Sequence, residues 1–220
     1  MPIPQDKVKT VKKEQEICII FSRYPRPGAV KTRLIPHLGR EGAAKLQRLM
    51  TEHVVAEAGR LARQNQVQLE LAMAGALPHE MEAWLGRQLS WQDQVGADLG
   101  ERMTFAIAQA FRRGFQHVVL VGADCPAVST AILAQAFEEL RRKDLVLGPT
   151  RDGGYYLIGL RCPNPALFAN IAWGSEQVLA QTLAAAAEAG VQPALLVGLA
   201  DVDRPEDLDV LPSALCDQLP

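Results

Sequence analysis

The sequence lacks any stretch of about eighteen apolar residues free of charges and helix breakers, and its first residues lack the continuous apolar segment of a signal peptide. We therefore expect a soluble, cytoplasmic protein with no membrane span. It also lacks a strong excess of one charge, because 23 Lys and Arg nearly balance 25 Asp and Glu. A net charge of −2 offers nucleic acid no global basic field. The lysines near the start predict a flexible basic tail over residues 1–15.

The spacing typical of a zinc site or a disulfide framework is missing as well. Four cysteines and four histidines are scattered without a C-x-x-C or H-E-x-x-H pattern. We expect the thiols to be reduced and mostly structural, with Cys125 buried although it follows Asp124. Any metal ion must then be held by carboxylates and phosphates.

No internal repeat or low-complexity linker divides the chain, so residues 16–220 are predicted to form one domain. Apolar runs typical of buried strands alternate with helical periodicity. Expected strands lie at 17–21, 67–74, 117–122, 145–148, 155–160 and 194–199. Expected helices lie at 40–64, 78–88, 96–113, 130–142, 175–188 and 205–208. This alternation predicts a mostly parallel sheet covered by helices, with a local departure where strands 145–148 and 155–160 are too close for a crossover helix.

A basic loop follows the first strand. It carries Arg23, Arg26, Lys31 and Arg33 between Ser22 and Leu34, is stiffened by two prolines that include Pro27, and can approach a ligand closely at Gly28. Arginine forks and a lysine point charge suit phosphate oxygens and charge that builds on a leaving diphosphate or pyrophosphate. The spacing of a Walker loop is absent. A merely solvated basic loop is the alternative.

Two groups of carboxylates follow later strands. Asp124 comes directly after strand 117–122, where open α/β sheets place ligand chemistry, and is the better candidate ligand for Mg²⁺ or Mn²⁺. Asp201 or Asp203 can supply a second carboxylate, and both point to one side if strand 194–199 continues. Alternatively, Asp203 is only the N-cap of the helix that begins near Pro205.

Two glycine-containing turns are further candidates for ligand contact. Asp152, Gly153 and Gly154 join two strands, and Tyr155 and Tyr156 then alternate, so that one packs while the other faces the cleft. Gly96 and Asp98 precede a helix, where Asp98 with Glu101 and Arg102 also fits ordinary helix-start charge placement. Ser175, after Trp173 and Gly174, is explained as an N-cap without any function.

Taken together, these segments resemble the bacterial DUF2064 family, also labelled the arsenosugar-biosynthesis-type glycosyltransferase family. The resemblance covers about residues 17–211 and is carried by FSRYPRPGAVKTRL, QVGADLGERM, VGADCP, GPTRDGGYYLIGL, WGSEQVL and DVDRPEDL. It implies a three-layer α/β/α, Rossmann-like nucleotide-diphospho-sugar transferase (GT-A) fold with a mixed sheet, which binds nucleotide over its amino-terminal half and acceptor over the rest. Asp124 matches the aspartate of the D-x-D metal motif, but the first aspartate of that motif is absent here.

The resemblance implies metal-assisted transfer of a glycosyl group from a nucleotide sugar to a small acceptor. The catalytic candidates are Lys31, Arg33 and Asp152, and the metal candidates are Asp124 and Asp203. The nucleotide- and substrate-binding candidates are Ser22, Arg23, Pro27, Gly28, Lys31, Arg33, Gly96, Asp98, Asp124, Gly153, Gly154 and Tyr155. Similar loops also occur in guanylyltransferase-like enzymes that join a nucleoside triphosphate to a phosphorylated molecule and release pyrophosphate. A nucleotide-binding protein without turnover is a third hypothesis, and the oligomeric state stays open.

Overall fold

The computed structural model describes residues 16–65 and 67–219, so the predicted basic tail lies outside the described residues. The strands in this part of the chain are β1 (Glu16–Arg23), β2 (Gln68–Ala74), β3 (Ser90–Asp93), β4 (His117–Gly122), β5 (Leu145–Pro149), β6 (Tyr155–Leu160) and β7 (Ala194–Leu195). They form one sheet in the order β3-β2-β1-β4-β6-β5-β7. Only β6 runs antiparallel to its described neighbours, β4 and β5. The expected mostly parallel mixed sheet, with its departure at 145–160, is confirmed.

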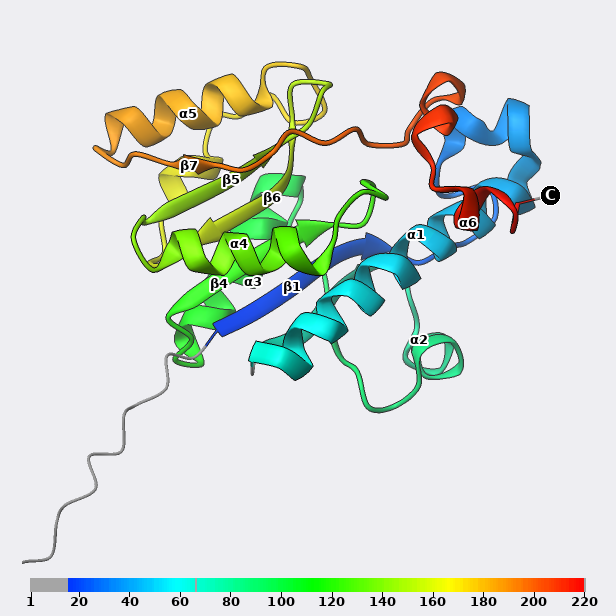
Figure 1. Ribbon diagram of the computed structural model, residues 1–220, viewed down its shortest axis with the longest axis horizontal. Coiled ribbons are helices and arrows are strands. Elements are labelled where there is room, and N and C mark those ends of the chain that lie inside the picture. Colours follow the sequence, from blue (N-terminus) through cyan, green and yellow to red (C-terminus); the bar gives the residue numbers. More distant parts are fainter. Residues whose placement is uncertain (1–15, 66, 220) are drawn as a thin grey trace, which may run out of the picture.

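Helices cover both faces of the sheet. The α-helices are α1 (Ile35–Asn65), α2 (Pro78–Leu85), α3 (Leu99–Arg112), α4 (Thr130–Leu140), α5 (Val178–Glu188) and α6 (Ser213–Cys216). Short 3₁₀ helices are η1 (Thr32–Leu34), η2 (Pro165–Phe168) and η3 (Pro205–Val210). Helices α1 and α4 lie in front of the sheet in Figure 1, and α3 and α5 pack on the other face. This is the predicted three-layer α/β/α fold.

Apolar side chains fill both layers between helices and sheet. The front layer contains Val54 and Leu61 of α1 and Phe137 of α4, all almost fully buried. The rear layer contains Ile107 of α3 and Ala186 of α5 against strand residues such as Ile19. Each fully buried aliphatic or aromatic side chain contributes about 1.5–3 kcal/mol, so the two layers rigidly fix the strand ends that carry the polar loops.

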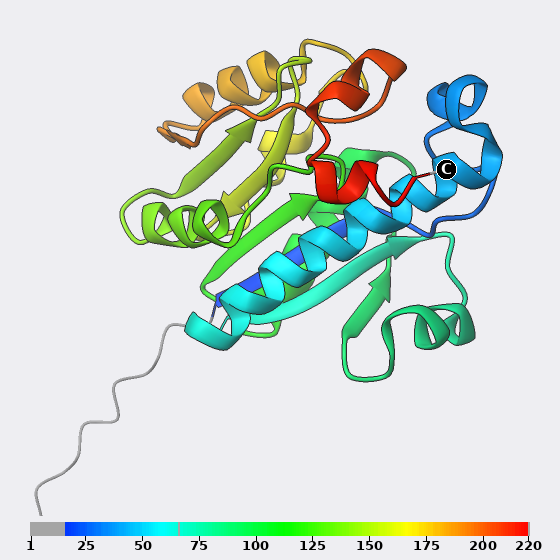
Figure 2. The same ribbon diagram turned by 45° about the vertical axis from the view of Figure 1, so that its right-hand side comes forward.

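A third apolar cluster attaches the end of the chain to the first helix. Leu211 and Leu215 pack with Val202 against Leu46 and Met50 of α1. Figure 2 shows α6 lying beside the amino-terminal half of α1. This packing brings residues 201–203 next to the basic loop, although about 170 positions separate them in the sequence.

Two predicted elements need correction. The strand expected at 194–199 is only β7, followed by an isolated bridge between Thr150 and Leu199, because Pro149 of β5 has no N–H to donate to the ladder. The helix expected from 175 begins at Val178, because residue 175 belongs to a preceding turn in which its hydroxyl donates to Ala172 O. The expected N-cap role of Ser175 is therefore wrong.

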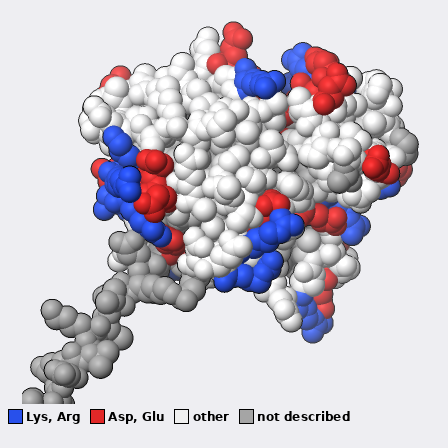
Figure 3. Space-filling model, viewed as in Figure 1, with Lys and Arg blue, Asp and Glu red and all other residues white. Residues whose placement is uncertain are grey.

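The first long helix also starts earlier than predicted. Helical backbone hydrogen bonds begin at Ile35, but Gly39 has φ 71° and interrupts the helix, so the regular part begins at Arg40 as the apolar periodicity predicted. Charged side chains of both signs lie intermixed on the face that α1 and α4 cover (Figure 3). Ion pairs within helices, such as Arg48 with Glu52 of α1 at 2.8 Å, join charges of opposite sign.

Candidate active-site cleft

A cleft of about 650 Å³ opens at one edge of the sheet. The parallel strands β1, β4 and β5 end at this edge, β6 begins there, and the chain returns there after β7. Carboxyl ends of parallel strands are where open α/β sheets bind ligands. Predicted site residues that line the cleft are Ser22, Arg23, Arg33, Asp98, Asp124, Asp152, Gly154, Tyr155 and Asp203.

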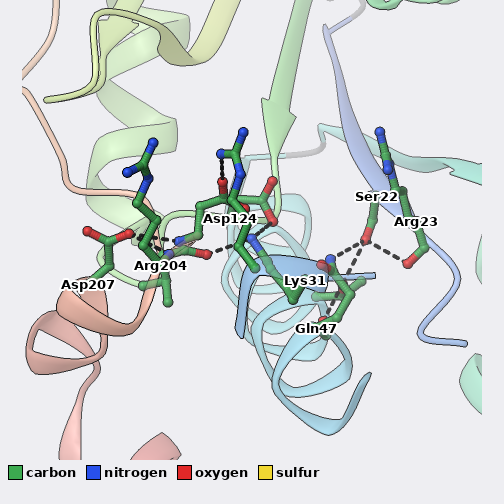
Figure 4. Close-up of polar contacts among 11 residues, drawn as sticks. Ser22, Arg23, Lys31, Gln47, Asp124, Arg204 and Asp207 are labelled. Carbon is green, nitrogen blue, oxygen red and sulfur yellow. Dashed lines mark hydrogen bonds and ion pairs between the residues drawn. The ribbon is translucent and has the colours of Figure 1, made fainter. Parts of the chain in front are cut away.

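Lys31 ties the basic loop to the carboxylate after β4. Its backbone is left-handed, with φ 46°, and its side chain is only 5% exposed. The ammonium pairs with Asp124 Oδ1 at 2.7 Å and donates to Val202 O at 2.7 Å, as Figure 4 shows. Val202 N in turn donates to Asp124 O. Lys31 therefore lies behind the cleft wall as a fixed positive charge beside Asp124, whose side chain is 57% exposed.

Arg33 and Asp203 form the second pair of opposite charges, and both line the cleft. The chain around Asp203 is held by Asp207, whose Oδ2 accepts the backbone N–H groups of residues 203 and 204. Arg204, not Asp203, occupies the N-cap position of η3. The capping alternative for Asp203 is therefore wrong. The assumed strand alternation is also wrong, because residues 201–203 are irregular, but both aspartates still line the cleft.

Asp152 lies in the turn between β5 and β6. Its Oδ1 accepts the Thr150 hydroxyl at 2.5 Å and the Gly154 N–H at 3.1 Å. Gly153 has φ +88° and faces the backbone of Glu176 so closely that an added Cβ would lie 2.1 Å from its oxygen. The turn thus requires glycine for packing, and Gly153 itself does not line the cleft.

Asp201 lines the cleft and is half-buried. Burial raises its pKa, and the nearby Asp152 carboxylate raises it further. The thiol of Cys125 is buried as expected, and burial with the charges of Asp201 and Asp124 raises its pKa as well. Burial is the main cause of both shifts, and neighbouring carboxylates add to it.

A neutral hydrogen-bond network lies at the other end of the cleft, around Ser22. Thr51 Oγ1 lies 2.7 Å from Ser22 Oγ, and Gln47 Nε2 donates to the same Ser22 oxygen at 3.2 Å. Gln94 Nε2 donates to Ser22 O at 3.0 Å and to Ala72 O at 2.9 Å. Gln47 and Gln94 both line the cleft and were not predicted. Gln47 could have been noticed in the sequence because it is a polar residue next to Leu46, on the apolar side of the predicted helix.

The segment before α3 forms another wall. Asp98 is the N-cap of this helix and accepts Glu101 N at 2.8 Å, as expected for helix-start charges. Gly96 has φ +145° and does not line the cleft. An added Cβ on Gly100 would lie 2.5 Å from the indole nitrogen of Trp173, which lines the cleft and packs edge-on against Tyr155. Trp173 was not predicted as a site residue.

The two tyrosines that begin β6 point to opposite faces of the sheet, as predicted, but both line the cleft, where only one was expected to face it. Tyr155 packs with the rear layer and Tyr156 with the front layer, where its hydroxyl donates to Val197 O at 3.2 Å. Burial raises the pKa of Tyr156 to about 12.

Of the predicted loop residues, Pro27 and Gly28 are exposed and lie outside the cleft, and Arg26 instead pairs with Glu80 at 2.9 Å.

An outer cavity of about 700 Å³ adjoins the cleft and shares Asp152, Asp201, Asp203 and Arg33 with it. Six carboxylates line it, namely Asp152, Glu176, Asp201, Asp203, Glu206 and Asp207. Three guanidinium groups also line it, those of Arg33, Arg151 and Arg204. This cavity therefore has an excess of negative charge.

The described residues contain no group of three or more His, Cys, Asp or Glu side chains arranged to hold a metal ion. Mg²⁺ sites in nucleotide-binding enzymes commonly use one or two carboxylates and complete the shell with phosphate oxygens and water. Asp124 and a second aspartate of the 201–203 segment suit that kind of site.

In the described part of the chain, no helix is long and apolar enough to cross a membrane.

The fold and cleft define a nucleotide-diphospho-sugar transferase-like α/β protein. Residues 55–175 match the family described as "Uncharacterized protein conserved in bacteria (DUF2064)". A crystal structure of a candidate nucleotide-diphospho-sugar transferase from Desulfovibrio desulfuricans G20 is 38% identical, with TM-score 0.82, covering 89% of this chain and 86% of that one. The chain belongs to the DUF2064 family, as the sequence motifs indicated.

More distant structures share the fold alone. CMP:2-keto-3-deoxy-manno-octonic acid synthetase complexed with CTP is 11% identical, with TM-score 0.55, over 93% of this chain and 100% of that one. Rv0371c from Mycobacterium tuberculosis H37Rv, in complex with manganese, is 18% identical, with TM-score 0.51, over 93% of this chain and 100% of that one. No curated protein matches the chain.

Proposed function

We propose that this protein transfers a glycosyl group from a nucleotide-diphospho-sugar to a small acceptor, assisted by Mg²⁺ or Mn²⁺. The description of the 38% identical relative as a candidate nucleotide-diphospho-sugar transferase supports this donor class. We further propose that it acts in the cytoplasm, because the four cysteines are unpaired in the structure, as suits a reducing compartment.

Lys31 and Arg33 are the groups that favour departure of the nucleoside diphosphate. Arg33 lines the cleft, and its guanidinium can bind phosphate oxygens through parallel N–H donors. Lys31 is fixed beside Asp124 and contributes its charge without having to reorganise. Both cations stabilise the negative charge that grows on the leaving group as the bond between the sugar and the phosphate breaks.

Asp124 and Asp203 are the residues we assign to the metal ion, and Asp201 adds to the negative charge beside them. Burial raises the pKa of Asp201, and repulsion from the Asp152 carboxylate raises it further; a bound cation would relieve that repulsion. When bound, the ion supplies charge neutralisation for the diphosphate.

Asp152 is the candidate base. Its Oδ1 is held by Thr150 and Gly154, so the carboxylate is oriented at the boundary between the cleft and the outer cavity. In the proposed reaction, the acceptor oxygen forms a bond to the anomeric carbon and the bond from that carbon to the phosphate oxygen breaks. The leaving diphosphate takes the bonding electron pair, and Asp152 takes the acceptor proton.

The observation that carries the choice of reaction is the charge of the outer cavity. Its six carboxylates exceed its three guanidinium groups, so a phosphorylated acceptor is repelled there and a neutral or cationic acceptor is favoured. Transfer of a nucleotide to a phosphorylated molecule needs an anionic acceptor, whereas glycosyl transfer does not.

Nucleotidyl transfer with release of pyrophosphate is the second candidate. It is favoured by the shared fold with a CTP-bound synthetase over 93% of this chain. The same Lys31 and Arg33 can stabilise a leaving pyrophosphate. Lys31 and Arg33 therefore suit either reaction, and the products distinguish them.

The test incubates the protein with nucleotide sugars or nucleoside triphosphates, a metal ion and a panel of neutral and phosphorylated acceptors. Release of nucleoside diphosphate from a nucleotide sugar is the expected result, with Asp124→Asn as the inactive control. Pyrophosphate release from a triphosphate contradicts glycosyl transfer and supports the second candidate. Binding without turnover across both panels supports the third hypothesis, a nucleotide-binding protein that lacks catalysis.

A further inference from the structure

The amide of Gln94 has only one possible orientation. Its Nε2 lies 3.0 Å from Ser22 O and 2.9 Å from Ala72 O. Both partners are backbone carbonyls, which only accept, so the amide must place its NH₂ group toward them and use both of its N–H donors. The carbonyl oxygen of Gln94 therefore faces away from β1 and β2.

The orientation of Gln47 follows from a chain of hydroxyl groups. Thr51 Oγ1 donates to the backbone oxygen of Gln47 at 2.8 Å, and the Ser22 hydroxyl can then donate to Thr51 Oγ1 at 2.7 Å. Ser22 Oγ is left to accept, and Gln47 Nε2 donates to it at 3.2 Å. The hydroxyl protons of Thr51 and Ser22 are then both donated, and neither is left for the side-chain oxygen of Gln47. That oxygen must therefore face away from Ser22.

Both amide oxygens are available at the surface of the cleft. Among the described residues, neither oxygen accepts a hydrogen bond, and the buried polar side-chain atoms without a partner are those of Tyr155 and Thr182. Gln47 is only 4% exposed and lines the cleft, so the small exposed part of it faces the cleft. Figure 4 shows Gln47 and Ser22 joined on the side of the cleft away from Asp207.

We infer that Gln47 and Gln94 select a guanine base. The inference rests on the proposed function, in which the cleft binds a nucleotide. Two fixed acceptors that flank Ser22 match a base edge that carries two adjacent donor groups. Guanine offers N1–H beside N2–H₂ on one edge, whereas in adenine and cytosine the ring nitrogen beside the amino group is itself an acceptor, and in uracil the imino N–H lies between two carbonyl oxygens. The ligand class assigned to this end of the cleft is therefore a guanosine diphosphate or a sugar linked to it.

The test is calorimetric titration of GDP, ADP, UDP and CDP, each with Mn²⁺, into the parent protein and into Gln94→Met. Methionine keeps the length of the side chain but removes the acceptor. The parent should bind GDP about tenfold more tightly than the other three, and Gln94→Met should lose about that factor for GDP alone, as expected for one hydrogen bond. Gln92→Met is the matched control, because Gln92 bonds Glu70 and does not line the cleft.

The readout that matters is the ratio of affinities among bases, since a merely structural role would weaken all four diphosphates equally. Gln47→Met should also reduce the preference for GDP over the other diphosphates if the packing with Thr51 tolerates methionine. If Gln47→Met does not fold, the result for Gln94→Met decides whether the inference holds. Preference of the parent for another base overturns the inference while leaving the proposed function intact, as does equal weakening of all four in Gln94→Met. Failure of every diphosphate to bind overturns the proposed function itself.

Discussion

The two ends of the cleft hold their polar groups in different ways. One end is charged, with Lys31 against Asp124 and Arg33 against Asp203. At the other end, beside Arg23, the neutral amides of Gln47 and Gln94 are oriented by hydroxyl and carbonyl groups around Ser22. We refer to these as the charged end and the amide end.

The difference separates two tasks of a nucleotide site. Charges act over several ångströms and suit phosphates and a metal ion, whose position varies little between nucleotides. Neutral hydrogen bonds act only at short range and suit the distinction between bases. Changes at the charged end should therefore affect affinity and turnover for all nucleotides, and changes at the amide end should affect the choice among them.

The largest effect is expected for Asp124→Asn at the charged end. Removing this charge should lower the rate of turnover by about 10²–10³-fold, as for loss of one preorganised electrostatic group. It also leaves the buried Lys31 ammonium without a carboxylate, so the free energy of unfolding should fall by about 1–2 kcal/mol. Steady-state kinetics and urea unfolding measure the two effects.

The matched control is Asp144→Asn, which removes an exposed aspartate paired with Arg161 at 3.6 Å outside the cleft. It should leave both rate and stability unchanged. If Asp124→Asn turns over like the parent, the assignment of the charged end to catalysis is wrong.

A smaller effect is expected for Arg33→Gln. Arg33 is 61% exposed, so its ion pair with Asp203 contributes little to stability, and the melting temperature should stay the same. Loss of a charged phosphate contact should weaken binding of nucleoside diphosphates about tenfold, whatever the base. Arg26→Gln, in the same loop but paired with Glu80 away from the cleft, should bind like the parent. Equal binding by Arg33→Gln and Arg26→Gln would remove Arg33 from the phosphate site.

The next prediction concerns Asp201→Asn, which should stabilise the free protein. The folded state raises the pKa of Asp201, so its ionised form is less favourable in the folded protein than in the unfolded chain. Removing the charge should raise the melting temperature by about 1–2 °C at neutral pH. The gain should disappear as the pH falls through the raised pKa, because the parent Asp201 is then protonated too. Thermal melts of both proteins across acidic pH measure this, and a constant difference at every pH would contradict the electrostatic cause.

The last prediction concerns the rates at which the four cysteine thiols react. Burial raises the pKa of Cys18 to about 12, and burial with nearby carboxylates also raises that of Cys125. Cys162 and Cys216 are exposed. A thiol reagent at neutral pH should therefore modify two thiols quickly and the other two only on unfolding. Fast modification of Cys125 would show that the charged end is more open than its burial indicates.

Much of the fold was predictable from the sequence because its signals are local. Apolar runs gave β1 and β4, periodicity gave α1 and α3, and the short connection between β5 and β6 gave the antiparallel pair. The length of β7 was not predictable, since it depends on Pro149 of a neighbouring strand.

The candidate site was only partly predictable, for a related reason. Asp124 and Arg33 could be found in the sequence because each is a charged residue in a short loop that follows an apolar strand. Gln47 looks like an ordinary helix residue, and its role depends on Ser22, which lies 25 positions earlier. Sequence patterns report on periodicity within an element, whereas the amide end is built from contacts between elements.

The most direct test of this division is the binding of GDP and UDP, each with and without Mn²⁺, to the parent, Asp124→Asn and Gln94→Met. We predict that Asp124→Asn loses the metal dependence of binding but still prefers GDP. We also predict that Gln94→Met keeps the metal dependence but binds both diphosphates alike. If either substitution removes both properties together, or Asp124→Asn changes the base preference alone, the two ends of the cleft do not have separate tasks.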